Sequence, residues 1–122
     1  ANLSCGVAQP SDGALPQLQE FDPNTVSSLG HYRVVDVRQP EEFYGQLGHI
    51  EGAESVPLAT VSARATLGVK EEPILVVCHA GGRATSAGEL LLEMGFKEVA
   101  NLTGGMVAWS EIHHTAIAGE LQ

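Results

Sequence analysis

The stretch "PILVVCHAGGRATSAGELLLEMG" (residues 73–95) contains an apolar run, a glycine-rich turn and an amphipathic segment in direct succession. The run 73–78 is continuously apolar, which is typical of a central parallel strand covered on both faces. From Ala84 onward apolar residues recur at helical spacing, and Gly95 fits the left-handed position that ends many helices. The stretch therefore predicts a strand, a tight turn and a helix.

Similar elements alternate along the rest of the chain. Apolar and β-branched runs predict strands over 32–37, 53–58 and 98–102, and capping and periodicity signals predict helices over 22–30, 40–46, 60–67 and 104–112. This rhythm predicts an α/β domain with a mainly parallel sheet and helices on both faces. Ligands bind such sheets beyond the carboxyl ends of the strands, and Cys78 stands at the carboxyl end of the most apolar one.

The size and composition of the chain limit the classes of protein to consider. Its 122 residues, 43% hydrophobic and 17% charged, suit one soluble domain, which we place at 17–116 between a loose arm (1–16) and a tail (117–122). No apolar run reaches the roughly 18 residues of a membrane span. The formal charge of −9 argues against nucleic acid as a partner, because phosphate binding needs a basic face.

Two cysteines, Cys5 and Cys78, are too few for a disulfide scaffold or a zinc quartet. We therefore interpret Cys78 as a free thiol, and predict neither a metal nor a cofactor. Cys5 is either an incidental thiol in the arm or a resolving thiol that attacks an oxidised Cys78. A free thiol predicts a cytoplasmic location, or a periplasmic one if the N-terminus at Ala1 is processed.

The turn after Cys78 has the features of an anion cradle. Backbone amides of residues 79–84 can turn inward, and Gly81 and Gly82 can adopt positive φ angles. The following helix directs its partial positive charge to the same point, and Arg83 adds a fixed charge, either on a ligand or as a brace for the turn. These effects favour a reactive thiolate. The alternative is a buried thiol in an ordinary turn, since cysteine is among the most buried residue types.

Three blocks of the sequence, 34–58, 74–96 and 101–109, resemble the signature blocks of single-domain rhodanese-like sulfurtransferases. They carry a D-V-R strand end, a G-H-I-x-G-A turn, a C-x-x-G-x-R loop and a G-G-x-x-A-W helix. The resemblance implies a five-stranded parallel core and a cysteine that carries sulfane sulfur as a persulfide. It assigns catalysis to Cys78, and donor binding to the loop residues His79, Ala80, Gly81, Gly82 and Arg83.

Three further residues receive supporting roles from the resemblance. Asp36 is expected to brace the loop, with Arg38 or Arg83 as its partner, because a buried acid needs one. His49 is expected to pin the G-H-I turn by hydrogen bonds. The alternatives are direct catalysis by Asp36 and an acid–base or ligand role for His49. His79 either binds anions at the loop rim when protonated or faces solvent.

The predicted function is transfer of sulfur from a donor such as thiosulfate or a persulfide to cyanide or a thiol. Small-molecule donors and acceptors are the expected partners, with a persulfide-accepting protein as a further one. One alternative is a binding, persulfide-carrier or redox-sensing module. Another is a phosphatase or arsenate reductase, but related enzymes of those classes place one more residue between Cys and Arg than the four found here.

Overall fold

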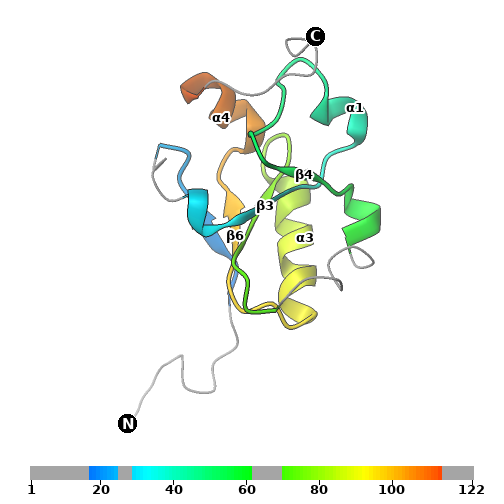
Figure 1. Cartoon of the computed structure of the whole chain (residues 1–122), viewed down its shortest axis with the longest axis vertical. Helices are drawn as coiled ribbons and strands as arrows, with labels where there is room; N and C mark the ends of the chain where they lie inside the picture. Colours follow the sequence, from blue (N-terminus) through cyan, green and yellow to red (C-terminus); the bar gives the residue numbers. More distant parts are fainter. Residues whose placement is uncertain (1–16, 25–28, 62–69, 114–122) are drawn as a thin grey trace.

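The computed structural model describes residues 17–24, 29–61 and 70–113 (Figure 1). Five strands form one sheet in the order β2-β6-β5-β3-β4, and each neighbouring pair is parallel. The strands are β2 (Gln19–Phe21), β3 (Arg33–Asp36), β4 (Glu54–Ser55), β5 (Ile74–Val77) and β6 (Val99–Leu102). The helices are η1 (Leu29–His31), α1 (Pro40–Phe43), η2 (Leu58–Thr60), α3 (Gly82–Glu93) and α4 (Gly105–Ile112). The predicted α/β fold with a five-stranded parallel sheet is confirmed.

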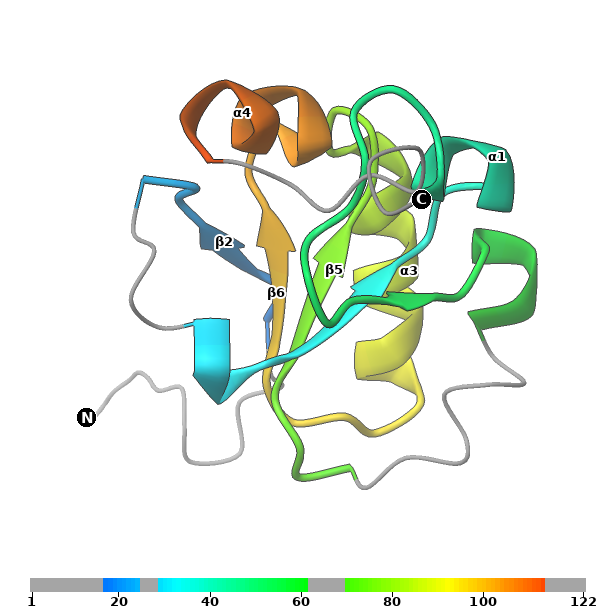
Figure 2. The same ribbon diagram turned by 45° about the horizontal axis from the view of Figure 1, so that its top comes forward.

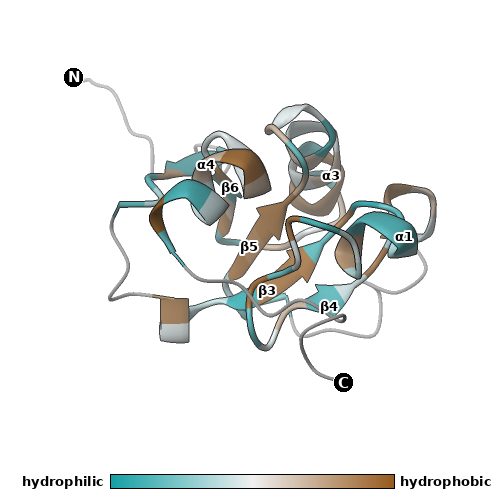
Figure 3. Ribbon diagram, turned by 90° about the horizontal axis from the view of Figure 1, so that it is seen from above, coloured by the Kyte–Doolittle hydropathy of each residue, from teal (hydrophilic) through white to brown (hydrophobic). Residues whose placement is uncertain are grey.

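The central strand β5 is buried on both faces, and its side chains alternate between two hydrophobic clusters. Ile74 and Val76 belong to the cluster beneath α3, whereas Leu75 and Val77 pack with α4. Figure 2 shows α3 running alongside the sheet, and Figure 3 shows β5 apolar along its length. Double-sided burial explains why this strand is a continuous apolar run rather than an alternating pattern.

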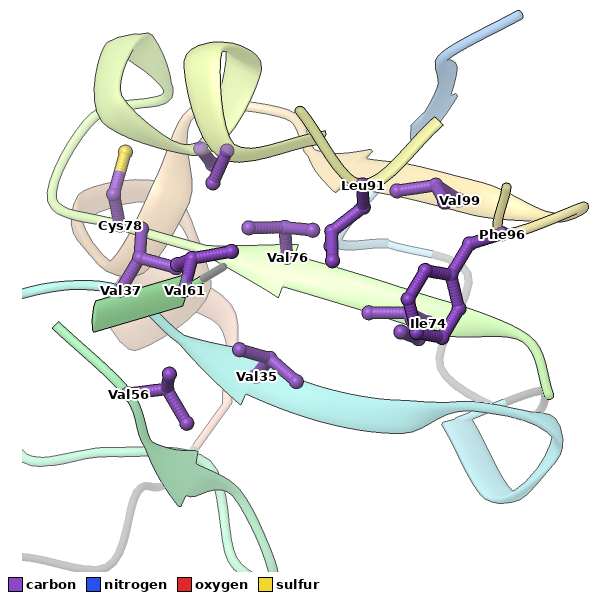
Figure 4. Close-up of a cluster of buried hydrophobic side chains, with 12 residues drawn as sticks. Val35, Val37, Val56, Val61, Ile74, Val76, Cys78, Leu91, Phe96 and Val99 are labelled. Atoms are coloured by element: carbon purple, nitrogen blue, oxygen red, sulfur yellow. The ribbon is translucent and has the colours of Figure 1, made fainter. Parts of the chain in front are cut away.

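The C-terminus of α3 has the predicted glycine stop. Gly95 adopts φ +105°, and its N–H donates to the carbonyl of Leu92 at 3.0 Å. The N–H of Phe96 donates to the carbonyl of Leu91 at 3.1 Å, which completes a Schellman motif. Phe96 is thereby buried beside Leu91 in the core (Figure 4).

The strand β2 was not predicted from the sequence, and the helix predicted just after it, over 22–30, was wrong at the described residues. At the described residues of the predicted helix over 22–30, the Asp22 side chain accepts a hydrogen bond from the Asn24 N–H, and the short η1 turn begins at Leu29. Residues 25–28 lie outside the described part of the chain. Of the predicted helix over 60–67, Thr60 is the last residue of η2, and residues 62–67 are also outside the described part.

The predicted arm and tail, with Cys5, lie outside the described residues. Within the part of the chain that the structure describes, no helix has the length and apolarity needed to cross a membrane.

Candidate functional site

Cys78 directly follows β5, at the carboxyl end of the sheet, and only 1% of its surface is exposed. Its sulfur lies on the side of the sheet that α3 covers (Figure 4) and accepts a hydrogen bond from the N–H of Gly81 at 3.0 Å. Gly81 adopts φ +120°, a conformation that L side chains rarely reach, and is the N-cap of the twelve-residue α3. Gly82 is already helical, so of the two glycines only Gly81 uses a positive φ.

The first turn of α4 holds the other side of the loop. The N–H of Met106 donates to the carbonyl of Cys78 at 2.8 Å, and that of Val107 to the carbonyl of His79 at 3.0 Å. Because the C=O and N–H of a trans peptide point in opposite directions, the N–H groups of His79 and Ala80 point away from α4. The loop amides are therefore oriented by backbone hydrogen bonds, independently of any ligand.

Gly105 permits this close approach of α4 to the loop. It adopts φ +60°, and a Cβ atom at this position would lie 2.5 Å from the carbonyl oxygens of both Cys78 and His79. Gly104 adopts φ +77°, and a Cβ there would lie 2.6 Å from the Cβ of Ala108. In the G-G-x-x-A-W segment, Gly105 is thus required for packing against the cysteine loop, and Gly104 for packing against Ala108 of α4.

Arg83 forms a bidentate ion pair with Glu42 of α1, with nitrogen–oxygen distances of 2.7 and 2.9 Å. The hydrogen bond from Arg83 lowers the pKa of Glu42 from 4.5 to about 2. The same hydrogen bond is the largest cause that raises the pKa of Arg83. The ion pair is compatible with the brace, one of the two roles considered for Arg83, and both roles stay predictions. Glu42 was not among the predicted site residues. Its place in the first turn of the helix after β3 was the feature of the sequence that could have indicated it.

Asp36 and Arg38 form a buried pair at the end of β3, with 0% and 1% of their surfaces exposed. Arg38 donates to both carboxylate oxygens of Asp36, at 2.9 and 2.8 Å, and to the carbonyl of Gly48 at 2.7 Å. The partner of Asp36 is therefore Arg38 rather than Arg83. The pair connects the strand end to the turn that follows α1.

His49 lies in that turn and is half-buried. Its Nδ1 lies 2.8 Å from the carbonyl oxygen of Phe43 and must carry the proton, because a carbonyl only accepts. The imidazole stacks on the Phe43 ring, with centroids 3.8 Å apart and planes 7° apart. Both contacts join the turn to Phe43, the last residue of α1, which is compatible with the pinning role that the resemblance implies. His79 and Ala80 are exposed at the rim of the cysteine loop.

The arrangement suits an anionic sulfur atom. One backbone N–H already points at the Cys78 sulfur, and the N-terminus of α3 contributes its positive dipole end at the same place. Across residues 17–24, 29–61 and 70–113, no three His, Cys, Asp or Glu side chains gather as metal ligands.

Comparisons with known proteins agree with this arrangement. The chain matches the rhodanese-like domain model over residues 20–112. It is 35% identical over 98 residues to the putative sulfur carrier protein YrkF of Bacillus subtilis, covering 80% of this chain and 52% of YrkF. It is 31% identical over 97 residues to the thiosulfate sulfurtransferase GlpE of Pseudomonas aeruginosa, covering 78% of this chain and 86% of GlpE.

Among solved structures, a rhodanese with anions from E. coli superposes with a TM-score of 0.57 at 32% identity, covering 70% of this chain and 94% of that one. The family match spans β2 to the end of α4, and so includes both sides of the cysteine loop. The chain therefore belongs to the family of rhodanese-like domains.

Proposed function

We propose that this protein is a sulfurtransferase in which Cys78 carries sulfane sulfur as a persulfide. The donor is thiosulfate or a persulfide, and the acceptor is a thiol, on a small molecule or a protein, or cyanide. The carrying observation is the Gly81 N–H directed at the Cys78 sulfur, 3.0 Å away, at the N-terminus of α3. The names of the two relatives, a sulfurtransferase and a sulfur carrier, support sulfur transfer at the level of the family.

The reaction proceeds by two displacements at sulfur. The Cys78 thiolate attacks the outer sulfur of thiosulfate, and a new S–S bond forms as the old one breaks. Sulfite leaves with the electron pair, and Cys78 keeps the outer sulfur as a persulfide anion. An acceptor thiolate or cyanide then attacks that outer sulfur, which yields a new persulfide or thiocyanate and returns the Cys78 thiolate. Atoms and charge balance in each step without a cofactor.

The loop contributes electrostatic stabilisation of the two anionic states of Cys78. The Gly81 N–H donates to the sulfur in the resting state. The N–H groups of His79 and Ala80, which point away from α4, are available to the outer sulfur of the persulfide. Fixed amide donors of this kind stabilise a developing charge without reorganisation. In this proposal Arg83, Asp36, Arg38 and His49 keep the loop and its α1 neighbour in place and do not touch the transferred sulfur.

Loop size supports sulfur chemistry over phosphoryl chemistry. With four residues between Cys78 and Arg83, and with Arg83 bound to Glu42, the loop has a small cradle and no unpaired guanidinium for an oxyanion.

A second candidate, a persulfide carrier that passes sulfur to a partner protein, is favoured by the similarity to YrkF. A carrier uses the same persulfide and differs only in turning over slowly without its partner. A reduced Cys78 also fits the cytoplasm, where we place the protein.

The direct test is turnover with thiosulfate and cyanide, monitored as thiocyanate, beside a phosphoester substrate. We expect thiocyanate from the wild type, none from Cys78→Ser, and no phosphate release from either. A persulfide that forms on Cys78 but turns over slowly with both cyanide and a small dithiol would identify the carrier. Phosphoester hydrolysis that depends on Cys78, without thiocyanate formation, would contradict sulfur transfer.

A further inference from the structure

Asn101 is a buried amide in an otherwise apolar strand. The other residues of β6, Val99, Ala100 and Leu102, are hydrophobic and fully buried, and Asn101 itself is 5% exposed. Strand alternation places Asn101 with Val99 on the α3 side of the sheet. Its Oδ1 is buried and has no hydrogen-bond partner among the residues that the structure describes, which costs stability. Because the unpaired oxygen makes Asn101 unfavourable for the stability of β6, we expect this side chain to have a role other than packing.

The amide nitrogen of Asn101 connects β2 to α3. It donates to the Thr85 hydroxyl oxygen at 3.2 Å and to the two carboxylate oxygens of Glu20 at 3.4 and 3.3 Å. Thr103 donates to the same carboxylate at 2.8 Å. Because a carboxylate only accepts hydrogen bonds, the NH2 group of the Asn101 amide must face Glu20. The same NH2 group then also faces the Thr85 hydroxyl.

Thr85 transmits this connection to the cysteine loop. Its hydroxyl donates to the carbonyl of Gly81 at 2.9 Å, and its N–H donates to the same carbonyl at 3.1 Å. Gly81 is the residue with φ +120° whose own N–H donates to the Cys78 sulfur. A continuous series of hydrogen bonds therefore runs from Glu20 through Asn101, Thr85 and Gly81 to the sulfur.

We propose that Asn101 and Thr85 are positioning residues that hold the Gly81 N–H on the Cys78 sulfur. Without the Thr85 hydroxyl, the Gly81 carbonyl keeps only the hydrogen bond from the Thr85 N–H. Because glycine has wide conformational freedom, the Gly81 N–H can then rotate away from the Cys78 sulfur. Neither residue touches substrate, and both act through Gly81. The inference rests on the proposed function, since its effect is on the rate at which Cys78 takes up sulfur.

The test uses a pair of variants at one position. Thr85→Val removes the hydroxyl at nearly constant shape, whereas Thr85→Ser keeps it. We expect Thr85→Val and Asn101→Leu to slow persulfide formation on Cys78 about tenfold, a smaller effect than deleting a charge-stabilising donor outright. Thr85→Ser should remain near the wild-type rate. Asn101→Leu removes the unpaired Oδ1 together with the three hydrogen bonds of the amide nitrogen, so we expect its urea midpoint to stay near that of the wild type.

A second readout reports the loop itself without any sulfur donor. The backbone amide resonance of Gly81 should shift and exchange its proton faster in Thr85→Val, and stay at its wild-type position in Thr85→Ser. Wild-type loading rates in Thr85→Val and Asn101→Leu, or an unchanged Gly81 resonance, would overturn the positioning role. If Asn101→Leu does not fold, the two Thr85 variants still decide. A wild type that takes up no sulfur would refute the proposed function, and the Gly81 resonance would then decide the positioning role separately.

Discussion

The carboxylate of Glu42 and the guanidinium of Arg83 meet in a bidentate ion pair that joins α1 to the helix carrying the cysteine loop. The two residues are 41 positions apart in sequence. About one-third of each side chain is exposed, so solvent screens the pair and its contribution is modest. In the proposed function its main consequence is that Arg83 braces the loop and leaves the sulfur to the backbone amides.

Acid should remove the stabilisation that this pair provides. The folded-state pKa of Glu42, about 2, is below its ordinary value of 4.5, so the contribution is complete above pH ~5 and declines as the pH falls toward 2. Glu42→Gln, which keeps a side chain compatible with the helix cap, should lower the free energy of unfolding by about 1 kcal/mol at neutral pH. In urea titrations, the difference from the wild type should shrink steadily below pH ~5.

The control is Glu41→Gln, which removes the same charge from the neighbouring exposed position and leaves Arg83 paired. It should unfold within about 0.5 kcal/mol of the wild type at every pH. Equal effects of the two substitutions would show that net charge, and not the pair, accounts for the loss.

A methyl group at Gly105 should displace the cysteine loop. Gly105→Ala places a Cβ 2.5 Å from the carbonyl oxygens of Cys78 and His79, on a backbone with φ +60°. We expect it to destabilise the fold by about 2 kcal/mol or more and to lower sulfur-transfer activity. Gly82→Ala is the matched change within the loop, because its Cβ meets nothing within 4 Å and its backbone is helical. It should be neutral or stabilise by up to about 1 kcal/mol in urea unfolding. Similar losses for both would argue against the close approach of α4.

The buried Asp36–Arg38 pair should respond as a unit. Asp36→Asn leaves a buried guanidinium without its counter-charge, and Arg38→Met leaves a buried carboxylate, so each should cost about 3 kcal/mol or more. The double variant should be more stable than the sum of the two single losses implies, because neither charge remains unpaired. Chemical denaturation of the four proteins measures this coupling. Strictly additive losses would mean that the two side chains do not stabilise each other.

Local patterns in the sequence predicted the part of the fold that depends on local structure. The β5–loop–α3 unit follows from a continuous apolar run, two glycines and helical periodicity, and its glycine stop at Gly95 follows from backbone conformation alone. The strand β2 escaped the same reasoning because it has three residues and only Phe21 is buried. Its pairing with β6 joins residues that are far apart in the chain, so no short stretch of the sequence can indicate it.

The candidate site divides in the same way. The positions of Cys78 and of the Asp36–Arg38 pair follow from strand ends, and neighbours two residues apart are visible in the sequence. Glu42 and Asn101 were missed because their partners, Arg83 and Glu20, are 41 and 81 positions away. Such contacts depend on which strands are adjacent in the sheet, and the order β2-β6-β5-β3-β4 is a property of the whole fold.

Mass spectrometry of the protein after exposure to thiosulfate or an organic persulfide tests the Cys78 persulfide most directly. We expect a mass increase of one sulfur atom, mapped by peptide analysis to Cys78, removed by cyanide with release of thiocyanate, and missing from Cys78→Ser. Cys5 provides an internal control, as the only other cysteine in the chain. Absence of added sulfur on Cys78 with every donor, or equal loading of Cys78→Ser through Cys5, would contradict the proposal.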